Sequence, residues 1–386
     1  MLIFAAWIVA ISLSLPLVML AVECAVGSIP GRPGPPLRDA PPFTVLMPAH
    51  DEARGIGTAI RAVRNQMRSG DRLIVIADNC SDATADIART LGATVVERYD
   101  PERRGKGYAL EAARAHVDPD PHRIIIVLDA DCIPQRHALR HLAAAAAHER
   151  AAVQATNLLS LPIGATALVR VSCFAFMVKN LVRQRALQRV AGFALLQGTG
   201  MGFPRSLYAR IDWGGGSLVE DLDLGVRLIA AGERVVFDER AMFLSPASSE
   251  AATIGQRRRW EHGMLGAIHR NAPLLLRAAL ANRRPRLLIV ALDQIVPPTV
   301  MLVACAIIAW MAMLIGVGLA GPTLVLGWAL ALLGVGLTAA WWTTGRQVLP
   351  PDMLGQLARY MVWKAPIGLQ FLTRREGRWI RTEREP

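Results

Sequence analysis

Residues 124–131 read Ile-Ile-Ile-Val-Leu-Asp-Ala-Asp, an apolar run that ends in two aspartates placed two positions apart. A short β-branched run is typical of a strand buried on both faces of a parallel sheet. Two carboxylates directly after such a strand suit a hard divalent cation, which completes its shell with water and phosphate oxygens. Asp129 and Asp131 are therefore candidate metal ligands, and the alternative is a solvated turn.

Short apolar runs and helix-like stretches alternate on both sides of this segment. This alternation predicts an α/β fold with a mostly parallel sheet covered by helices. Ligands of such sheets bind beyond the carboxyl ends of the strands. The expected strands are 43–47, 73–77, 94–96, 124–128 and 152–155, and the expected helices are 56–67, 83–91, 107–115 and 138–147.

Polar segments follow the first two expected strands, as they follow the fourth. Residues 48–52 read PAHDE and contain Glu52, and residues 78–82 read DNCSD and begin with Asp78. In each segment alone, an aspartate after a strand is usually a helix cap or a turn residue. Because three such segments should converge on one crevice, we favour a ligand site.

Three further motifs carry charge suited to anion binding or proton transfer. In 103–107 (RRGKG), glycines and a helix N-terminus favour an anion near Lys106. The pair Glu220-Asp221 opens an apolar helix, where a carboxylate can serve as general base towards a hydroxyl. In 256–260 (QRRRW), guanidinium groups can grip a diphosphate. The alternatives are a basic surface run, helix capping and a basic amphipathic stretch, respectively.

Two apolar blocks explain the hydrophobic content of 53%. Residues 1–22 carry no charge and are long enough to cross a bilayer of ~30 Å, whereas a signal peptide would need a basic start. The block 287–342 divides into an interfacial segment (287–296) and two spans near 299–319 and 323–343. For 354–372, which is broken by charges and Pro366, we favour an interfacial helix over a fourth span.

The net charge is +12, and many of the basic residues flank the second apolar block. Lysine and arginine bias of this kind places the flanks in the cytoplasm. No zinc-finger or RNA-binding motif accompanies the charge, so nucleic acid is not an expected partner. The five scattered cysteines, without a C-x-x-C, indicate a reducing compartment.

The order of these motifs resembles that of a membrane-bound family-2 glycosyltransferase, the group that includes cellulose, hyaluronan and ceramide-glucose synthases. The resemblance rests on Asp78, on Asp129-Ala-Asp131, on Glu220-Asp221, and on Gln256-x-x-Arg259-Trp260 followed by paired spans. It implies the GT-A fold, a nucleotide-binding α/β sandwich. The implied organisation is a transmembrane helix (1–26), a Pro/Gly linker (27–42), a catalytic domain (43–265), a basic interfacial segment (266–298), two transmembrane helices (299–343) and a tail (344–386).

The resemblance also implies a function. An inverting, metal-dependent enzyme would move a sugar from a nucleotide-diphosphate sugar, with uracil as the expected base, to a lipid or glycan acceptor at the bacterial inner membrane, with polysaccharide-assembly proteins as further partners. Asp221 would be the catalytic base beside Glu220, and Mg²⁺ or Mn²⁺ would bind Asp131 and Asp129. Substrate would be bound by Glu52, Asp78, Lys106, Asp129, Gln256, Arg259 and Trp260, with 198–203 as an acceptor loop.

Two departures from the family pattern bear on substrates. The chain has Ala77-Asp78 where the family often has two aspartates, so base contacts rest on one carboxylate. Few spans follow the catalytic domain, which argues against a long translocation channel. Two alternatives stay open: a polyprenyl-phosphate sugar synthase, and a non-catalytic membrane scaffold that retains the fold. The basic, apolar stretch 168–190 is either an acceptor-binding membrane element or an ordinary covering helix.

Overall fold

The computed structural model describes residues 1–31, 40–117, 119–120, 123–214, 219–247 and 250–373, without the side chains of 250–259 and 365–373. The chain divides into two compact units. One contains Gly31–Pro162 and Phe193–Ala247, and the other contains Met1–Pro30, Ile163–Gly192 and Ser248–Glu385. Each unit is described by itself below.

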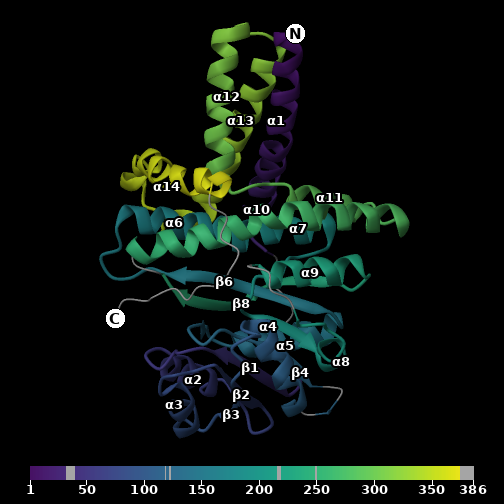
Figure 1. Cartoon of the computed structure of the whole chain (residues 1–386), viewed down its shortest axis with the longest axis vertical. Helices are drawn as coiled ribbons and strands as arrows, with labels where there is room; N and C mark the ends of the chain where they lie inside the picture. The colour runs from purple at the N-terminus through teal and green to yellow at the C-terminus, as the bar shows by residue number, and fades with distance from the viewer. Residues whose placement is uncertain (32–39, 118, 121–122, 215–218, 248–249, 374–386) are drawn as a thin grey trace. The chain divides into compact units, whose positions relative to one another are not determined.

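The first unit is built on an eight-stranded sheet in the order β3-β2-β1-β4-β7-β6-β8-β5 (Figure 1). Pairings β1–β2, β2–β3, β1–β4 and β6–β8 are parallel, and β4–β7, β6–β7 and β5–β8 are antiparallel. The expected mostly parallel α/β sheet is therefore confirmed. The strands are β1 (Phe43–Ala49), β2 (Arg72–Asp78), β3 (Thr94–Arg98), β4 (Ile124–Val127), β5 (Ile133–Pro134), β6 (Ala152–Ser160), β7 (Met201–Pro204) and β8 (Val235–Pro246).

Helices of this unit connect and cover the strands. All four residues of β4 are buried, as the β-branched run predicts. Helix α2 presents Ile56, Ala59, Ile60 and Val63 to the core at helical spacing. The helices are α2 (Ile56–Arg64), α3 (Thr84–Thr90), α4 (Lys106–Ala113), α5 (Ala138–Glu149), α8 (Arg205–Tyr208) and α9 (Glu220–Ala230), with a 3₁₀ turn at Arg114–His116.

Three strands have no counterpart among the expected elements. β5 has only two residues, and β7 contains a glycine, which weakens a strand signal. β8 carries the charged run Asp238, Glu239 and Arg240 at its centre, beside a register shift between Ala155 and Thr156 of β6. A bulge of this kind interrupts the period-two pattern by which a strand is recognised.

The second unit contains three helices that are long and apolar enough to cross a membrane, by length and composition. They are α1 (Leu2–Gly27), α12 (Thr299–Val317) and α13 (Gly321–Ala340), which a π-helical turn extends to Gly345. The three lie side by side (Figure 1). Their packing is close, because a Cβ on Gly336 of α13 would stand 2.8 Å from the Ala21 carbonyl oxygen of α1.

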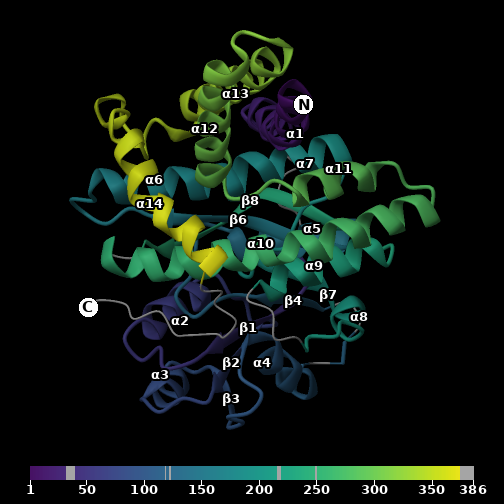
Figure 2. The same cartoon turned by 45° about the horizontal axis from the view of Figure 1, so that its top comes forward.

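The remaining helices of this unit include polar residues or are shorter than the three long apolar helices. Helix α14 crosses α10 (Figure 2), and the Lys364 ammonium is paired there with the Glu261 carboxylate. The helices are α6 (Ala167–Met177), joined through a π-helical turn to α7 (Arg183–Ala191), then α10 (Glu250–Ala281), α11 (Arg286–Gln294) and α14 (Gln356–Thr373), with a 3₁₀ turn at Pro351–Met353.

A buried polar network joins four helices of this unit. Arg183 of α7 donates to Glu23 of α1 and to Asp293 of α11, each at 2.6 Å. Gln294 donates to Asp293 at 2.8 Å and accepts from Asn271 of α10 at 3.2 Å. All five residues are at least nine-tenths buried, so this network fixes α1, α7, α10 and α11 to one another.

Candidate active site

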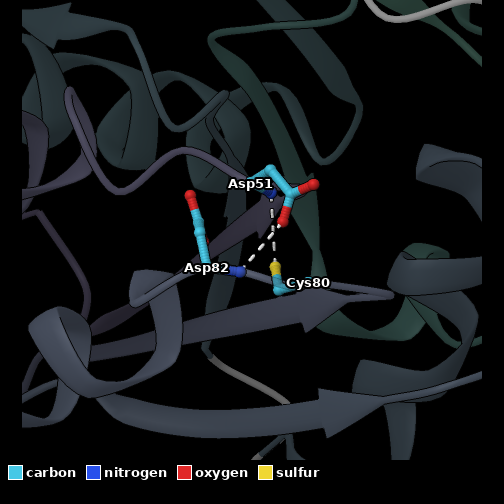
Figure 3. A group of neighbouring side chains, drawn as sticks. All are labelled: Asp51, Cys80 and Asp82. Atoms are coloured by element: carbon cyan, nitrogen blue, oxygen red, sulfur yellow. Dashed lines mark hydrogen bonds between the residues drawn. The ribbon is translucent and has the colours of Figure 1, made fainter.

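The carboxyl ends of β1, β2 and β4 lie at one edge of the sheet, because these strands are parallel. Figure 3 shows how the segments after β1 and β2 are braced there. The Asp51 N–H donates to Cys80 Sγ at 3.4 Å, and the Asp82 N–H donates to Asp51 Oδ1 at 3.3 Å. The ligand-type atoms of Asp51, Cys80 and Asp82 lie within 4.8 Å of one another. Since Asp51 already accepts backbone N–H groups, we interpret this group as a brace between strand ends.

Glu52 and Asp78 are held at these same strand ends. The Glu52 N–H donates to Thr84 Oγ1 at 2.8 Å, and the Glu52 side chain is partly buried. Asp78 is 7% exposed, and its Oδ1 accepts from Arg98 at 2.6 Å and from Asn79 at 3.0 Å. Arg98, at the end of β3, was not among the predicted site residues. Its arginine type and strand-end position were its only signal.

Asp129, Asp131 and Cys132 form a second group whose ligand-type atoms all lie within 4.8 Å of one another. A turn after β4 brings them together, closed by the Cys132 N–H donating to the Asp129 carbonyl oxygen at 3.0 Å. Burial raises the pKa of the Cys132 thiol well above its usual value, so we assign the ligand role to the two carboxylates. Oxygen donors at this spacing fit Mg²⁺ or Mn²⁺.

Lys106 is the first residue of α4 and lies against Asp129. Its ammonium donates to Asp129 Oδ1 at 2.6 Å, with side-chain exposures of 16% for Lys106 and 41% for Asp129. Burial disfavours the charged form of Lys106, but the negative charges of Asp129 and Asp221 favour it more strongly, so the pKa of Lys106 is raised. A Cβ on Gly107 would stand 2.0 Å from the Trp213 carbonyl oxygen, so only glycine fits after the lysine.

Glu220 and Asp221 open helix α9, where the helix N-terminus favours negative charge. Burial and the charge of Asp221 raise the pKa of Glu220 to about 8, although the Gly107 N–H donates to its carboxylate. Burial also raises the pKa of Asp221, against the charge of Lys106. Lys106 thus stands among three acidic side chains, and two of them are poised to hold a proton nearer neutral pH than usual.

A glycine loop completes this cluster. The Gly198 carbonyl oxygen accepts from the Lys106 ammonium, and the Thr199 hydroxyl oxygen accepts from the Asp129 N–H at 3.1 Å. Gly198 has φ +95°, and a Cβ there would stand 2.7 Å from Asp221 Oδ2. The loop therefore needs glycine for its backbone conformation and for its approach to Asp221.

The predicted residues 256–260 belong to helix α10 of the other unit. The side chains of Gln256 and Arg259 lie outside the described residues. Trp260 is partly buried, and its ring packs on Phe176 of α6 with centroids 5.7 Å apart. The structure thus brings Lys106, Asp129, Asp131, Glu220 and Asp221 together in one unit.

Comparison with known proteins identifies the family. A family model described as "Glycosyltransferase like family 2" matches residues 41–263, and the chain belongs to this family. A probable glycosyltransferase, YdaM, of Bacillus subtilis (strain 168) is 28% identical over 247 residues, which are 59% of this chain and 56% of YdaM. The chain thus spans about half the length of that curated relative.

A solved structure shows the same fold. It is the mannosyltransferase PcManGT from Pyrobaculum calidifontis, in complex with GDP-Man and Mn²⁺. It is 18% identical, with a TM-score of 0.58, and the match covers 96% of this chain and 100% of that one. The resemblance to a GT-A fold is thereby confirmed. No comparison distinguishes a particular relation to cellulose or hyaluronan synthases.

Proposed function

We propose that the protein is an inverting glycosyltransferase that moves a sugar from a nucleotide-diphosphate sugar to a hydroxyl of a membrane-associated lipid or glycan. The observation that supports this most strongly is the cluster of Lys106, Asp129, Glu220 and Asp221. It joins the end of a central strand to the start of α9. Membership of the family supplies the reaction class.

The residues divide into a donor side and an acceptor side. Asp131 and Asp129 would hold a divalent cation, which neutralises charge on the departing diphosphate. Lys106 adds a fixed positive charge beside Asp129. On the acceptor side, the raised pKa of Asp221 makes its carboxylate a better base for the attacking hydroxyl. Attack from the face opposite the diphosphate inverts the anomeric carbon.

Asp78 supports a uracil nucleotide as donor. Among the described residues, its hydrogen bonds from Arg98 and Asn79 both fall on Oδ1. Oδ2 is then the oxygen left for a nucleobase, and it can accept the one imino N–H of uracil. The Watson–Crick edge of guanine presents two adjacent donors and would use both oxygens of a carboxylate. We therefore propose a UDP-sugar, although the structural relative binds GDP-Man.

Four further residues and the membrane belong to the proposal. Glu52 lies at the same sheet edge as Asp78, and we assign it to substrate binding. We assign Gln256, Arg259 and Trp260 to the diphosphate and the acceptor sugar on the motif alone. The three apolar helices support an integral membrane protein, and the basic flanks support a catalytic unit in the cytoplasm.

The test is incubation of membranes containing the protein with a panel of labelled UDP-, GDP- and dTDP-sugars. Products in the lipid and polymer fractions are then identified by mass spectrometry. We expect one UDP-sugar to label a product in the presence of Mn²⁺ or Mg²⁺, and a chelator to stop the labelling. Labelling only from a GDP-sugar would contradict the role of Asp78. No labelling and no donor hydrolysis would contradict the enzymatic function and favour a scaffold.

A further inference from the structure

The loop 197–199 contacts both sides of the proposed reaction centre. The Gly198 carbonyl oxygen accepts from Lys106, and Thr199 Oγ1 accepts from the Asp129 N–H. Gly198 also leaves no room for a side chain against Asp221. The position of this loop therefore determines where Lys106 stands between Asp129 and Asp221.

Gln154 of β6 binds this loop at both ends. Its Oε1 accepts from the Gln197 N–H at 2.8 Å, and its Nε2 donates to the Thr199 carbonyl oxygen at 2.9 Å. The remaining amide hydrogen is donated to the Ala155 carbonyl oxygen at 2.8 Å. The residue is 0% exposed, so water cannot replace these bonds without local opening.

The loop is held on its other side through the Thr199 hydroxyl. This hydroxyl donates to Cys132 Sγ at 3.2 Å, and Cys132 Sγ lies 2.8 Å from Ser245 Oγ. Ser245 in turn donates to Asn157 Oδ1 at 3.2 Å. These hydrogen bonds through Cys132 and Ser245 hold the Thr199 side chain, whereas Gln154 holds the backbone on both sides of Gly198.

We propose that Gln154 is a positioning residue for sugar transfer. It fixes the Gly198 carbonyl oxygen, which places Lys106 between the donor-side Asp129 and the acceptor-side Asp221. No substrate contact is required of it. The proposal rests on the proposed function, since it assigns the fixed loop to that reaction. Its specific consequence is that losing the clamp slows transfer by a larger factor than it weakens nucleotide binding, because Asp78 and Asp131 would still hold the base and the metal and none of the hydrogen bonds of Gln154 involves them.

The experiment compares Gln154→Met and Gln154→Glu with Thr156→Val. Methionine keeps the length and removes all three hydrogen bonds. Glutamate, which burial against two carbonyl oxygens keeps protonated, retains the acceptor for Gln197 and one donated hydrogen bond. Thr156 lies on the same strand, is also 0% exposed, and donates to the Glu239 carbonyl oxygen at 3.3 Å. The Thr156→Val control thus removes one buried hydrogen bond of β6 that does not involve the loop.

We expect Gln154→Met to lower kcat by about tenfold to a hundredfold, as for the loss of two or three hydrogen bonds, with the Kd for UDP changed by less than about threefold. Gln154→Glu should fall between Gln154→Met and wild type, and Thr156→Val should leave kcat within about twofold of wild type. Equal losses of kcat in Gln154→Met and Thr156→Val, or a parallel loss of UDP affinity, would overturn the proposal.

Amide hydrogen exchange of the peptide covering 195–201 gives a readout that does not depend on activity. We expect faster exchange there in Gln154→Met and Gln154→Glu than in wild type or Thr156→Val. Unchanged exchange would overturn the clamp, even if activity fell. If exchange rises as expected while wild-type protein transfers no sugar from any donor, the proposed function fails and the clamp on the loop stands. If Gln154→Met does not fold, Gln154→Glu carries both measurements.

Discussion

Two clusters in this protein pair one cation with several carboxylates, and they differ in access to water. In the first unit, Lys106 contacts Asp129, whose side chain is 41% exposed. In the second unit, Arg183 forms ion pairs with Glu23 and Asp293, whose side chains are 2% and 4% exposed. The same pairing of a cation with carboxylates thus has two different roles. The accessible cluster can exchange charge with a ligand, and the sealed one fixes four helices together.

The largest effect is expected from removing the proposed base of the accessible cluster. Asp221→Asn should lower transfer by about 10³-fold or more, because an amide cannot accept the hydroxyl proton. Binding of UDP, measured by calorimetry, should persist. Glu233→Gln, just past the end of α9 in a surface pair with Arg210, is the control and should stay close to wild type. Undiminished transfer by Asp221→Asn would refute its assignment as base.

In the sealed cluster, the effect should fall on stability. Arg183→Met leaves Glu23 and Asp293 buried without their cation, which typically costs about 3–5 kcal/mol. Arg189→Met is the control, since Arg189 lies on the same helix, is exposed, and donates to carbonyl oxygens of Val26, Ile29 and Pro30. We expect the control to cost about 1 kcal/mol or less. Thermal melting in detergent checks both, and equal shifts would show that burial of the cluster contributes nothing.

Measuring metal affinity distinguishes the Asp129–Asp131 pair from the Asp51–Cys80–Asp82 brace. Asp131→Asn should weaken Mn²⁺ binding by about tenfold or more, because one charged oxygen ligand is lost. The paramagnetic resonance signal of free Mn²⁺ measures this without any turnover. Asp82→Asn, in the Asp51–Cys80–Asp82 brace, should leave Mn²⁺ affinity unchanged. Weaker Mn²⁺ binding in Asp82→Asn and unchanged binding in Asp131→Asn would show that the metal binds at the brace instead.

The smallest effect is a pH dependence of stability from Glu220. Its pKa in the folded protein is about 8, above the ordinary value of 4.5, so the folded state holds this proton more tightly than the unfolded chain. The resulting stability is complete below about pH 4.5 and is lost as the pH rises through about 8. Metal-free wild type should therefore lose melting temperature relative to Glu220→Gln over this range, and Glu111→Gln should not change the profile. A constant difference would show that the Glu220 pKa is ordinary.

The sequence predicts elements best where one local pattern decides them. Strands 43–47 and 124–128 were recognisable because they are buried on both faces, so their apolar runs are continuous. Helix 138–147 was recognisable from its helical apolar period. β8 was missed because Asp238, Glu239 and Arg240 interrupt its pattern at a bulge that only the pairing with β6 explains.

In the candidate site, too, local sequence patterns predict some contacts, and long-range contacts decide the others. The structure places Lys106 against Asp129 and close to Asp221, as their positions at strand and helix ends suggest. The role of Gln154 depends on a contact 43 residues along the chain, which no local period encodes. Glu23 did carry a signal, since it follows an uncharged run of 22 residues and a charge in such a place is expected to pair.

The central claim is that the Lys106 cluster acts in sugar transfer and the Arg183 cluster in stability. Measuring transfer and melting of Lys106→Met and Arg183→Met side by side tests it most directly. We predict that Lys106→Met melts within a few degrees of wild type and transfers sugar about 10²-fold more slowly. We predict that Arg183→Met melts lower, and that its folded fraction transfers at the wild-type rate. Lowered melting with normal transfer in Lys106→Met, or slowed transfer by folded Arg183→Met, would contradict the account.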